Sequence, residues 1–150
     1  MEIGDKIPDV LGFDAEGNEI KAADFAGKKL VIYFYPKDNT PGCTAEACSL
    51  AAGYGELLAA GYAIVGVSKD SAASHKKFAE KHSLPFPLIA DTDLELNKAF
   101  GVWQLKKMCG RESMGTVRTT FLIDEEGRVA DIITKVNTKD AANQILNLKK

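Results

Sequence analysis

The chain has 150 residues, of which 45% are hydrophobic and 27% are charged, and its formal net charge is −2. This length is typical of one domain with a buried core, and the composition excludes an intrinsically disordered chain. The charge balance excludes the broad positive excess of proteins that bind nucleic acid or anionic membranes. The longest strongly apolar run, residues 30–35, is far shorter than the ~20 residues of a membrane-spanning helix. The N-terminus shows no secretion signal, so we expect a cytoplasmic protein with one domain, residues 1–150.

The first predicted elements are a hairpin, a buried strand and a helix. Apolar runs on either side of residues 14–18 indicate a short N-terminal hairpin. Residues 30–35 are rich in β-forming side chains and lack alternation, which indicates a strand buried on both faces. After a polar loop, residues 43–60 are predicted to form one helix that ends at Gly61.

The rest of the chain alternates strands and helices and then ends in a hairpin and a helix. The later predicted elements, in chain order, are a strand at 62–67, a helix from the capping residue Ser71 to His82, a strand that begins within 85–89, a helix at 92–100, a hairpin of 119–124 and 128–134, and a helix that opens at Thr138. The polar residues 106–115 are predicted to be a loop. Buried strands joined by helices favour parallel pairing, with the last hairpin as antiparallel edge strands. This order predicts an α/β thioredoxin-like fold, a central mixed sheet flanked by helices, with the N-terminal β-hairpin as an extension.

The segment Pro36-Lys-Asp-Asn-Thr-Pro-Gly-Cys-Thr-Ala-Glu-Ala-Cys48 holds the strongest candidates for chemistry. It places Cys43 at the first turn of the predicted helix, where unpaired N–H groups and the positive end of the helix dipole favour a thiolate. A helix end stabilises the thiolate by only about 0.3–1 kcal/mol, which is too little to keep most of a thiol ionised at neutral pH. A cationic partner is therefore expected. Arg118, just before the predicted strand at 119–124, suits this role better than Lys37 because its planar guanidinium group is permanently charged.

Three cysteines do not form the disulfide framework of a small secreted domain. Closely spaced cysteines in a cytosolic protein are more often catalytic, redox-active or metal-binding. A structural zinc site needs four ligands, usually in paired spacings. His75 and His82 are seven residues apart, or about 10.5 Å along a helix, which is too far for two ligands of one metal. Both are predicted to be solvated helix residues, and no metal or other cofactor is expected.

The segment that contains Cys43 resembles the active site of the peroxiredoxins, most closely the peroxiredoxin Q or bacterioferritin comigratory protein type. The family pattern Pro-x-x-x-Thr-x-x-Cys is matched by Pro36, Thr40 and Cys43, and the resolving cysteine of the helix is matched by Cys48. Residues 117–124 resemble the arginine-bearing strand of the family. The resemblance extends over nearly the whole chain.

The resemblance implies a thiol peroxidase that reduces hydrogen peroxide and organic hydroperoxides. Cys43 would attack the peroxide and become a sulfenic acid, while water or an alcohol leaves. Thr40 would hydrogen-bond the sulfur or the peroxide, Arg118 would hold the thiolate and polarise the O–O bond, and Pro36 would shield the pocket from water. Cys48 would then form an intramolecular disulfide, which thioredoxin or a glutaredoxin-like protein would reduce. This cycle needs no dimer, so a monomer is expected, without nucleic-acid or membrane partners.

Disulfide formation between Cys43 and Cys48 would require a change of structure. Two residues with this spacing on one helix have Cα atoms about 8.6 Å apart and side chains that point about 140° apart. A disulfide usually requires a Cα separation below about 7 Å. The helix must therefore unwind locally, and Gly53 and Gly55, just downstream, are typical of an element of low stability.

Other interpretations of these residues remain open. A thiol–disulfide oxidoreductase on a similar fold is disfavoured because the chain has no Cys-x-x-Cys motif. A metal-binding module would use the three cysteines, and a non-catalytic interaction domain would leave the matched motif unexplained. Cys109 departs from the family pattern and is either a free thiol, an alternative resolving residue or a site of intermolecular pairing. Thr40 also fits a simple turn or helix-cap residue.

Overall fold

The computed structural model describes residues 1–108 and 110–148, so Cys109 lies outside the described residues. Its elements, in chain order, are β1 (Val10–Phe13), β2 (Glu19–Lys21), the 3-10 helix η1 (Ala22–Phe25), β3 (Lys29–Phe34), α1 (Pro41–Ala52), α2 (Tyr54–Ala59), β4 (Tyr62–Ser68), α3 (Ala72–His82), β5 (Leu88–Ala90), α4 (Glu95–Ala99), β6 (Trp103–Met108), β7 (Arg111–Thr116), β8 (Thr119–Ile123), β9 (Val129–Ile133) and α5 (Ala141–Asn147). Within these residues, no helix is both long and apolar enough to cross a membrane.

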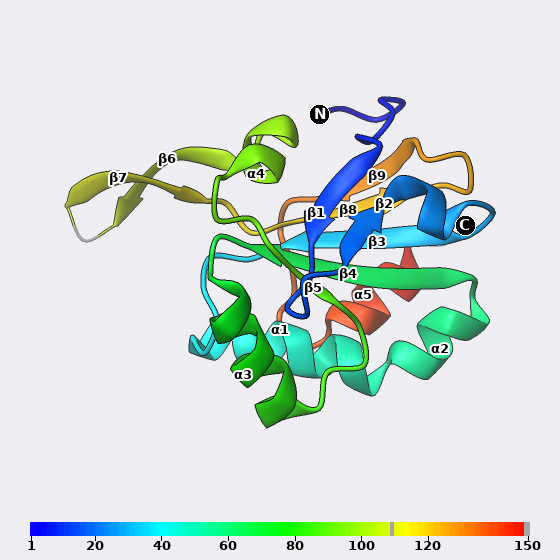
Figure 1. The fold of residues 1–150 in the computed structure, drawn as a ribbon, viewed down its shortest axis with the longest axis horizontal. Coiled ribbons are helices and arrows are strands. Elements are labelled where there is room, and N and C mark those ends of the chain that lie inside the picture. Colours follow the sequence, from blue (N-terminus) through cyan, green and yellow to red (C-terminus); the bar gives the residue numbers. More distant parts are fainter. Residues whose placement is uncertain (109, 149–150) are drawn as a thin grey trace.

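A five-stranded mixed sheet forms the centre of the molecule, with the order β5-β4-β3-β8-β9 (Figure 1). Strand β3 pairs in parallel with β4, which pairs in parallel with β5, whereas β8 is antiparallel to both β3 and β9. This confirms the predicted thioredoxin-like α/β fold with its N-terminal β1–β2 hairpin. The predicted edge position of the last hairpin is wrong for β8. That strand lies inside the sheet and all five of its residues are buried, so only β9 forms the edge.

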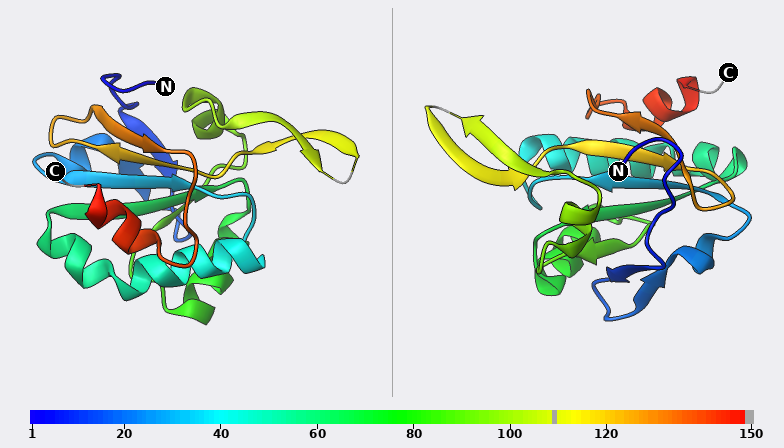
Figure 2. Two further views of the ribbon diagram at one scale, coloured as in Figure 1. Left: turned by 180° about the vertical axis from the view of Figure 1, so that it is seen from behind. Right: turned by 90° about the horizontal axis from the view of Figure 1, so that it is seen from above.

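The two faces of β3 carry two hydrophobic clusters. Val31 and Tyr33 face the layer that contains α1, α2, α3 and α5, while Leu30, Ile32 and Phe34 face the layer that contains β1 and α4. Figures 1 and 2 show these layers on opposite sides of the sheet. Both faces of the strand are therefore covered, which explains the apolar run without polar alternation.

The helix predicted over residues 43–60 is two helices, α1 and α2, which meet at Gly53. A Cβ atom at position 53 would overlap the Cβ atom of Ala142 on α5. Gly53 thus allows α5 to pack closely at the junction. Helix α3 begins as predicted, because Ser71 Oγ accepts a hydrogen bond from the Ser74 amide. Helices α4 and α5 each begin three residues later than predicted.

Within the loop predicted at 106–115, residues 106–108 and 111–115 belong to strands β6 and β7, whose hairpin projects from the body of the molecule (Figure 1). Its large apolar side chains Leu105 and Met114 are cross-strand partners and are 60% and 49% exposed. Residues 111–114 of β7 are all exposed, so this strand lacks the alternation of apolar and polar residues that marks a half-buried strand. At its base, the Val117 amide donates to the Val102 carbonyl oxygen at 2.8 Å.

Candidate active site

Cys43 lies in the first turn of α1, just beyond the loop that follows β3. Thr40 is the N-cap residue and Pro41 opens the helix with the fixed φ that suits its first position. The Cys43 side chain is buried, with only 1% exposed. Its Sγ atom accepts a hydrogen bond of 3.2 Å from Arg118 Nη2. The expected positions of Cys43 at a helix start and of Arg118 as its cationic partner are both observed.

Glu46 is a further member of this site that the sequence analysis missed. Arg118 Nη1 donates a hydrogen bond of 2.7 Å to Glu46 Oε1, and the Glu46 side chain is fully buried. Its other oxygen, Oε2, has no hydrogen-bond partner among the described residues. The signal in the sequence was the spacing of three residues between Cys43 and Glu46, which places both on one face of a helix. One guanidinium group therefore bridges the thiol and the carboxyl group.

In both Glu46 and Arg118, burial and the neighbouring charges shift the pKa in opposite directions. Burial raises the pKa of Glu46 to about 7, even though the Arg118 charge and hydrogen bond lower it. For Arg118, burial lowers the pKa, but the nearby Glu46 and Cys43 outweigh that effect and raise the pKa overall. The guanidinium group is therefore permanently charged, whereas Glu46 exchanges its proton near neutral pH.

Thr40 makes a different contact from the expected one with sulfur. Its Oγ1 atom donates a hydrogen bond of 2.9 Å to the Lys37 carbonyl oxygen. The turn between them includes Asn39, whose φ of 62° lies in the left-handed region. No bond from Thr40 to the Cys43 sulfur is observed within the described residues. Because its proton is engaged by Lys37, the hydroxyl group presents lone pairs as an acceptor.

The loop before Cys43 is anchored by Asp38, which is buried. Its carboxylate accepts hydrogen bonds from Tyr35 Oη at 2.7 Å and from Ser74 Oγ at 2.8 Å, and it lies 2.8 Å from His75 Nδ1. Burial raises the pKa of Asp38, but the bonds from His75, Tyr35 and Ser74 outweigh it and lower the pKa overall. These contacts tie the loop to α3.

The prediction that His75 is solvated is wrong. Its side chain is fully buried, and Nε2 lies 2.9 Å from the Ile89 carbonyl oxygen. The reason is a partner far along the chain, the Asp38 carboxylate, which offsets the cost of burying the ring. Asp38, Asp70 and His75 also bring three ligand atoms within 4.8 Å of one another. Asp70 Oδ2 also accepts hydrogen bonds from the Asp38 amide and the Ser68 hydroxyl, so the cluster is part of the network that holds the loop.

Cys48 lies on α1, the same helix as Cys43, and its side chain is exposed. Both cysteines are free thiols. Cys48 Sγ lies 3.7 Å from Nδ1 of His82, the last residue of α3. His82 is half-buried, so its side chain stays partly in solvent, as predicted, and in addition contacts Cys48.

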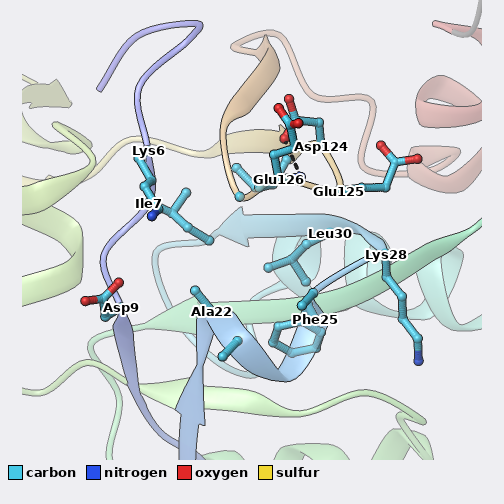
Figure 3. Close-up of a pocket in the computed structure, with 14 residues that line it drawn as sticks. Lys6, Ile7, Asp9, Ala22, Phe25, Lys28, Leu30, Asp124, Glu125 and Glu126 are labelled. Atoms are coloured by element: carbon cyan, nitrogen blue, oxygen red, sulfur yellow. Dashed lines mark hydrogen bonds between the residues drawn. The ribbon is translucent and has the colours of Figure 1, made fainter.

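Pro36 lines a hollow of about 230 Å³ between the loop and the β6–β7 hairpin. The hollow is also lined by side chains of mixed character, which are Lys37, Lys69, Lys106, Ser113, Met114 and Thr116. A second hollow of about 200 Å³ is shown in Figure 3 and is lined by residues that include Lys6, Phe25, Leu30 and Asp124. Leu30 is near the start of β3 and Pro36 follows its end, so the two hollows lie at opposite ends of that strand. The hollow of Figure 3 is therefore separate from the Cys43 site.

The sequence of the chain is similar to those of a known protein family. The model of the AhpC/TSA family matches residues 3–132. The chain is 47% identical over 150 residues to peroxiredoxin Bcp of Bacillus subtilis, across 100% of this chain and 96% of that protein. It is 36% identical over 147 residues to peroxiredoxin Bcp of Escherichia coli, across 98% and 94% of the two chains.

Solved structures agree with these relatives. A cysteine-to-serine variant of Xanthomonas campestris peroxiredoxin Q has a TM-score of 0.85 and 41% identity, across 91% of this chain and 87% of that chain. A similar variant of Xylella fastidiosa PrxQ has a TM-score of 0.89 and 32% identity, across 99% and 94%. The chain thus has a peroxide as its substrate and a thiol as its reductant. It belongs to the AhpC/TSA family and is a thiol-dependent peroxidase of the Bcp, or peroxiredoxin Q, type.

Proposed function

We propose that Cys43 is the peroxidatic cysteine of this peroxidase and that Arg118 is its electrostatic partner. The observation that carries the proposal is the 3.2 Å contact between Arg118 Nη2 and Cys43 Sγ at the start of α1. The thiolate attacks the nearer peroxide oxygen, the O–O bond breaks, and water or an alcohol leaves. The sulfur is oxidised to a sulfenic acid while the peroxide is reduced.

Two groups act on the peroxide in this proposal. Arg118 stabilises the negative charge that develops on the oxygens as the O–O bond breaks, a larger effect than ionisation of the thiol alone. The Thr40 hydroxyl group, whose proton is engaged by the Lys37 carbonyl, accepts the O–H proton of the peroxide. Arg118 would donate a hydrogen bond to one peroxide oxygen, and Thr40 would accept one from the other. Together these bonds would hold the peroxide in line with the sulfur.

Pro36 covers the site from solvent and borders the hollow beside the β6–β7 hairpin. The hollow combines the apolar Pro36 and Met114 with several lysines, so it suits the organic part of an alkyl hydroperoxide as well as water. A solved relative, the Xanthomonas campestris bacterioferritin comigratory protein, is described in terms of its alkyl peroxide reduction activity. We therefore include organic hydroperoxides with hydrogen peroxide as substrates.

Cys48 is the resolving cysteine in this proposal. It is exposed on the helix that buries Cys43, so the two sulfurs meet only after the intervening turns of α1 unwind. The resulting disulfide lies within one chain, which allows a monomer of one domain to complete the cycle. A dithiol protein such as thioredoxin or a glutaredoxin-like protein would then reduce the bond in the cytoplasm.

The test is intact-mass spectrometry and tryptic mapping after one equivalent of hydrogen peroxide. The proposal predicts a loss of two hydrogens that maps to a Cys43–Cys48 bond. A disulfide bond between Cys43 and Cys109 would support Cys43 as the peroxidatic cysteine but would make Cys109, and not Cys48, the resolving cysteine. A stable addition of oxygen to Cys43 would indicate a cycle with one cysteine, and an unreactive Cys43 would remove it as the peroxidatic residue.

A further inference from the structure

His82 lies beside Cys48 where α3 meets α1. Its Nδ1 atom is 3.7 Å from Cys48 Sγ, which is within hydrogen-bond distance for sulfur. The ring packs edge-on against Phe78, one turn earlier in α3, with ring centroids 5.1 Å apart. The imidazole is therefore oriented by packing against its own helix, with one nitrogen directed at the thiol.

The positions of the two residues on their helices favour transfer of a proton from sulfur to imidazole. His82 is the last residue of α3, where the negative end of the helix dipole stabilises an imidazolium ion. Cys48 lies in the second half of α1, beyond the positive end that favours a thiolate at Cys43. The contact with His82 is thus the interaction that distinguishes Cys48 from an exposed thiol at the middle of a helix.

Along their own helices, Cys48 and His82 have few ionisable neighbours. The residues one turn from Cys48 or His82 on their own helices carry none, and they are Thr44, Ala45, Ala51, Ala52, Phe78 and Ala79. The segment 83–87 that follows α3 also carries none. The charged residues near the end of α3 are exposed, and they are Lys77, Glu80 and Lys81. Exposed charges are screened by solvent, so the direct contact is between the thiol and the imidazole.

We propose that His82 is the general base of the resolving step, so that Cys48 leaves the helix as a thiolate. The thiolate attacks the sulfur of the Cys43 sulfenic acid, and the S–S bond forms as the S–O bond breaks. Hydroxide leaves and takes a proton from solvent to give water, and the imidazolium ion returns its proton to solvent. The Cys48 sulfur is oxidised and the Cys43 sulfur is reduced to the disulfide level. This inference rests on the proposed role of Cys48 as the resolving cysteine.

The first test measures the reactivity of Cys48 without peroxide. In a background with Cys43→Ser and Cys109→Ser, Cys48 is the one thiol, and its rate of alkylation by iodoacetamide is followed from pH 5 to pH 9. With His82 present, the rate near pH 7 should exceed that of the His82→Gln variant by about fivefold, the scale of one exposed ion pair. The His82→Gln profile should follow the ionisation of a single group.

Lys81→Gln is the matched control, because it removes an exposed positive charge from the adjacent position of α3 without touching Cys48. Its alkylation profile should coincide with that of the background protein. Equal rates in the His82→Gln and Lys81→Gln proteins near pH 7 would overturn the proposal. The chain has two histidines, so the proton NMR signals of their rings can be assigned with the His82→Gln variant. The His82 ring signals should move at a fixed pH when Cys48→Ala removes the thiol, because the contact at Nδ1 is lost, and unchanged signals would count against the pair.

A second test uses the intact set of cysteines in a single turnover with one equivalent of hydrogen peroxide. His82→Gln should slow disulfide formation by about fivefold and leave the rate of sulfenic acid formation unchanged. This split separates the two proposals. The peroxidatic role is tested by Cys43→Ser, the one variant that should lose sulfenic acid formation. An unaltered rate of disulfide formation in His82→Gln refutes only the role of His82.

Discussion

Gly42 makes room for the guanidinium group of Arg118, because a Cβ atom at position 42 would lie 3.2 Å from Arg118 Nη2. Gly42→Ala should displace that nitrogen by a few tenths of an ångström from the Cys43 sulfur. Small errors of position are costly for groups that stabilise a transition state, so peroxide reduction should slow by about tenfold. Stopped-flow measurement of the second-order rate constant with hydrogen peroxide checks this.

The matched control for that substitution is Gly55→Ala on α2, where a Cβ atom would have no neighbour within 4 Å. The rate should not change, and the free energy of unfolding should rise by about 0.5–1 kcal/mol because alanine suits a helix better than glycine. If both alanine variants reacted at the wild-type rate, Gly42 would have no role in placing Arg118.

Arg118→Ala should lower the rate with peroxide by more than a hundredfold at pH 7. Complete ionisation of an ordinary thiol gains only about thirtyfold at that pH, so a larger loss reports stabilisation of the transition state. Raising the pH to 9 should therefore leave most of the defect in place. Arg111→Ala, on the exposed strand β7, is the control and should react normally. Full recovery of the Arg118→Ala rate at pH 9 would assign the arginine to ionisation alone.

Glu46 should make stability depend on pH in a direction opposite to that of a carboxylate whose pKa is lowered by its partners, such as Asp38. Its pKa is about 7 in the folded protein against an ordinary value of 4.5. Between these values the unfolded chain loses the proton first, so the free energy of unfolding falls as pH rises and levels off above pH 7. The shift corresponds to about 3 kcal/mol. Below pH 4.5 both states hold the proton and this loss is absent.

Glu46→Gln keeps an oxygen for Arg118 Nη1 but cannot ionise, so it should remove this dependence. Urea unfolding at pH 4.5 and pH 8 should show the variant gaining about 3 kcal/mol relative to the wild type between the two conditions. Glu125→Gln, in the exposed β8–β9 turn, should change neither value by more than a few tenths of a kcal/mol. If the free energy of unfolding changed with pH in the same way in the wild type and Glu46→Gln, the buried carboxyl group would not be the cause of the pH dependence.

Ser49 should set the limit of unwinding in α1. It follows Cys48 directly, its Oγ atom accepts from the Ala141 amide at 3.1 Å, and it lies 3.1 Å from the Thr138 carbonyl oxygen. In the oxidised protein, hydrogen exchange should therefore become fast over residues 41–48 and stay slow over residues 50–52. Ser49→Ala releases this attachment to α5, so fast exchange should extend through residue 52.

Ser113→Ala, on the exposed strand β7, should leave the exchange pattern of α1 unchanged. If residues 41–48 were as protected in the oxidised protein as in the reduced one, the disulfide would form without unwinding, contrary to the distance argument.

The sequence predicts the central part of this molecule well because its signals there are local. The apolar run of β3, the Ser71 cap of α3 and the motif around Cys43 are each contained within a few residues. The pairing of Arg118 with Cys43 spans 75 residues of sequence, and it was predicted from the chemical need for a cation together with the resemblance to a family.

The misses at His75 and Glu46 share a dependence on distant partners. The charged neighbours of His75 on α3 predict a solvated ring, whereas the Asp38 carboxylate that pairs with the buried ring comes from another part of the chain. Glu46 was overlooked because a buried carboxyl group is recognised only once the guanidinium group beside it is known. Strand β7 of the β6–β7 hairpin is exposed along residues 111–114, and its run of polar residues carries no period-2 alternation that would predict a strand.

The closed base of that hairpin has a practical consequence. The Val117–Val102 hydrogen bond and the Thr116–Asn97 side-chain bond of 2.7 Å secure the chain immediately before Arg118. Changes of length or chemistry further out along β6 and β7 are thereby isolated from the guanidinium group. A spectroscopic label on the exposed residue Arg111 or Glu112, neither of which lines the hollow beside Pro36, should therefore leave peroxide turnover unchanged.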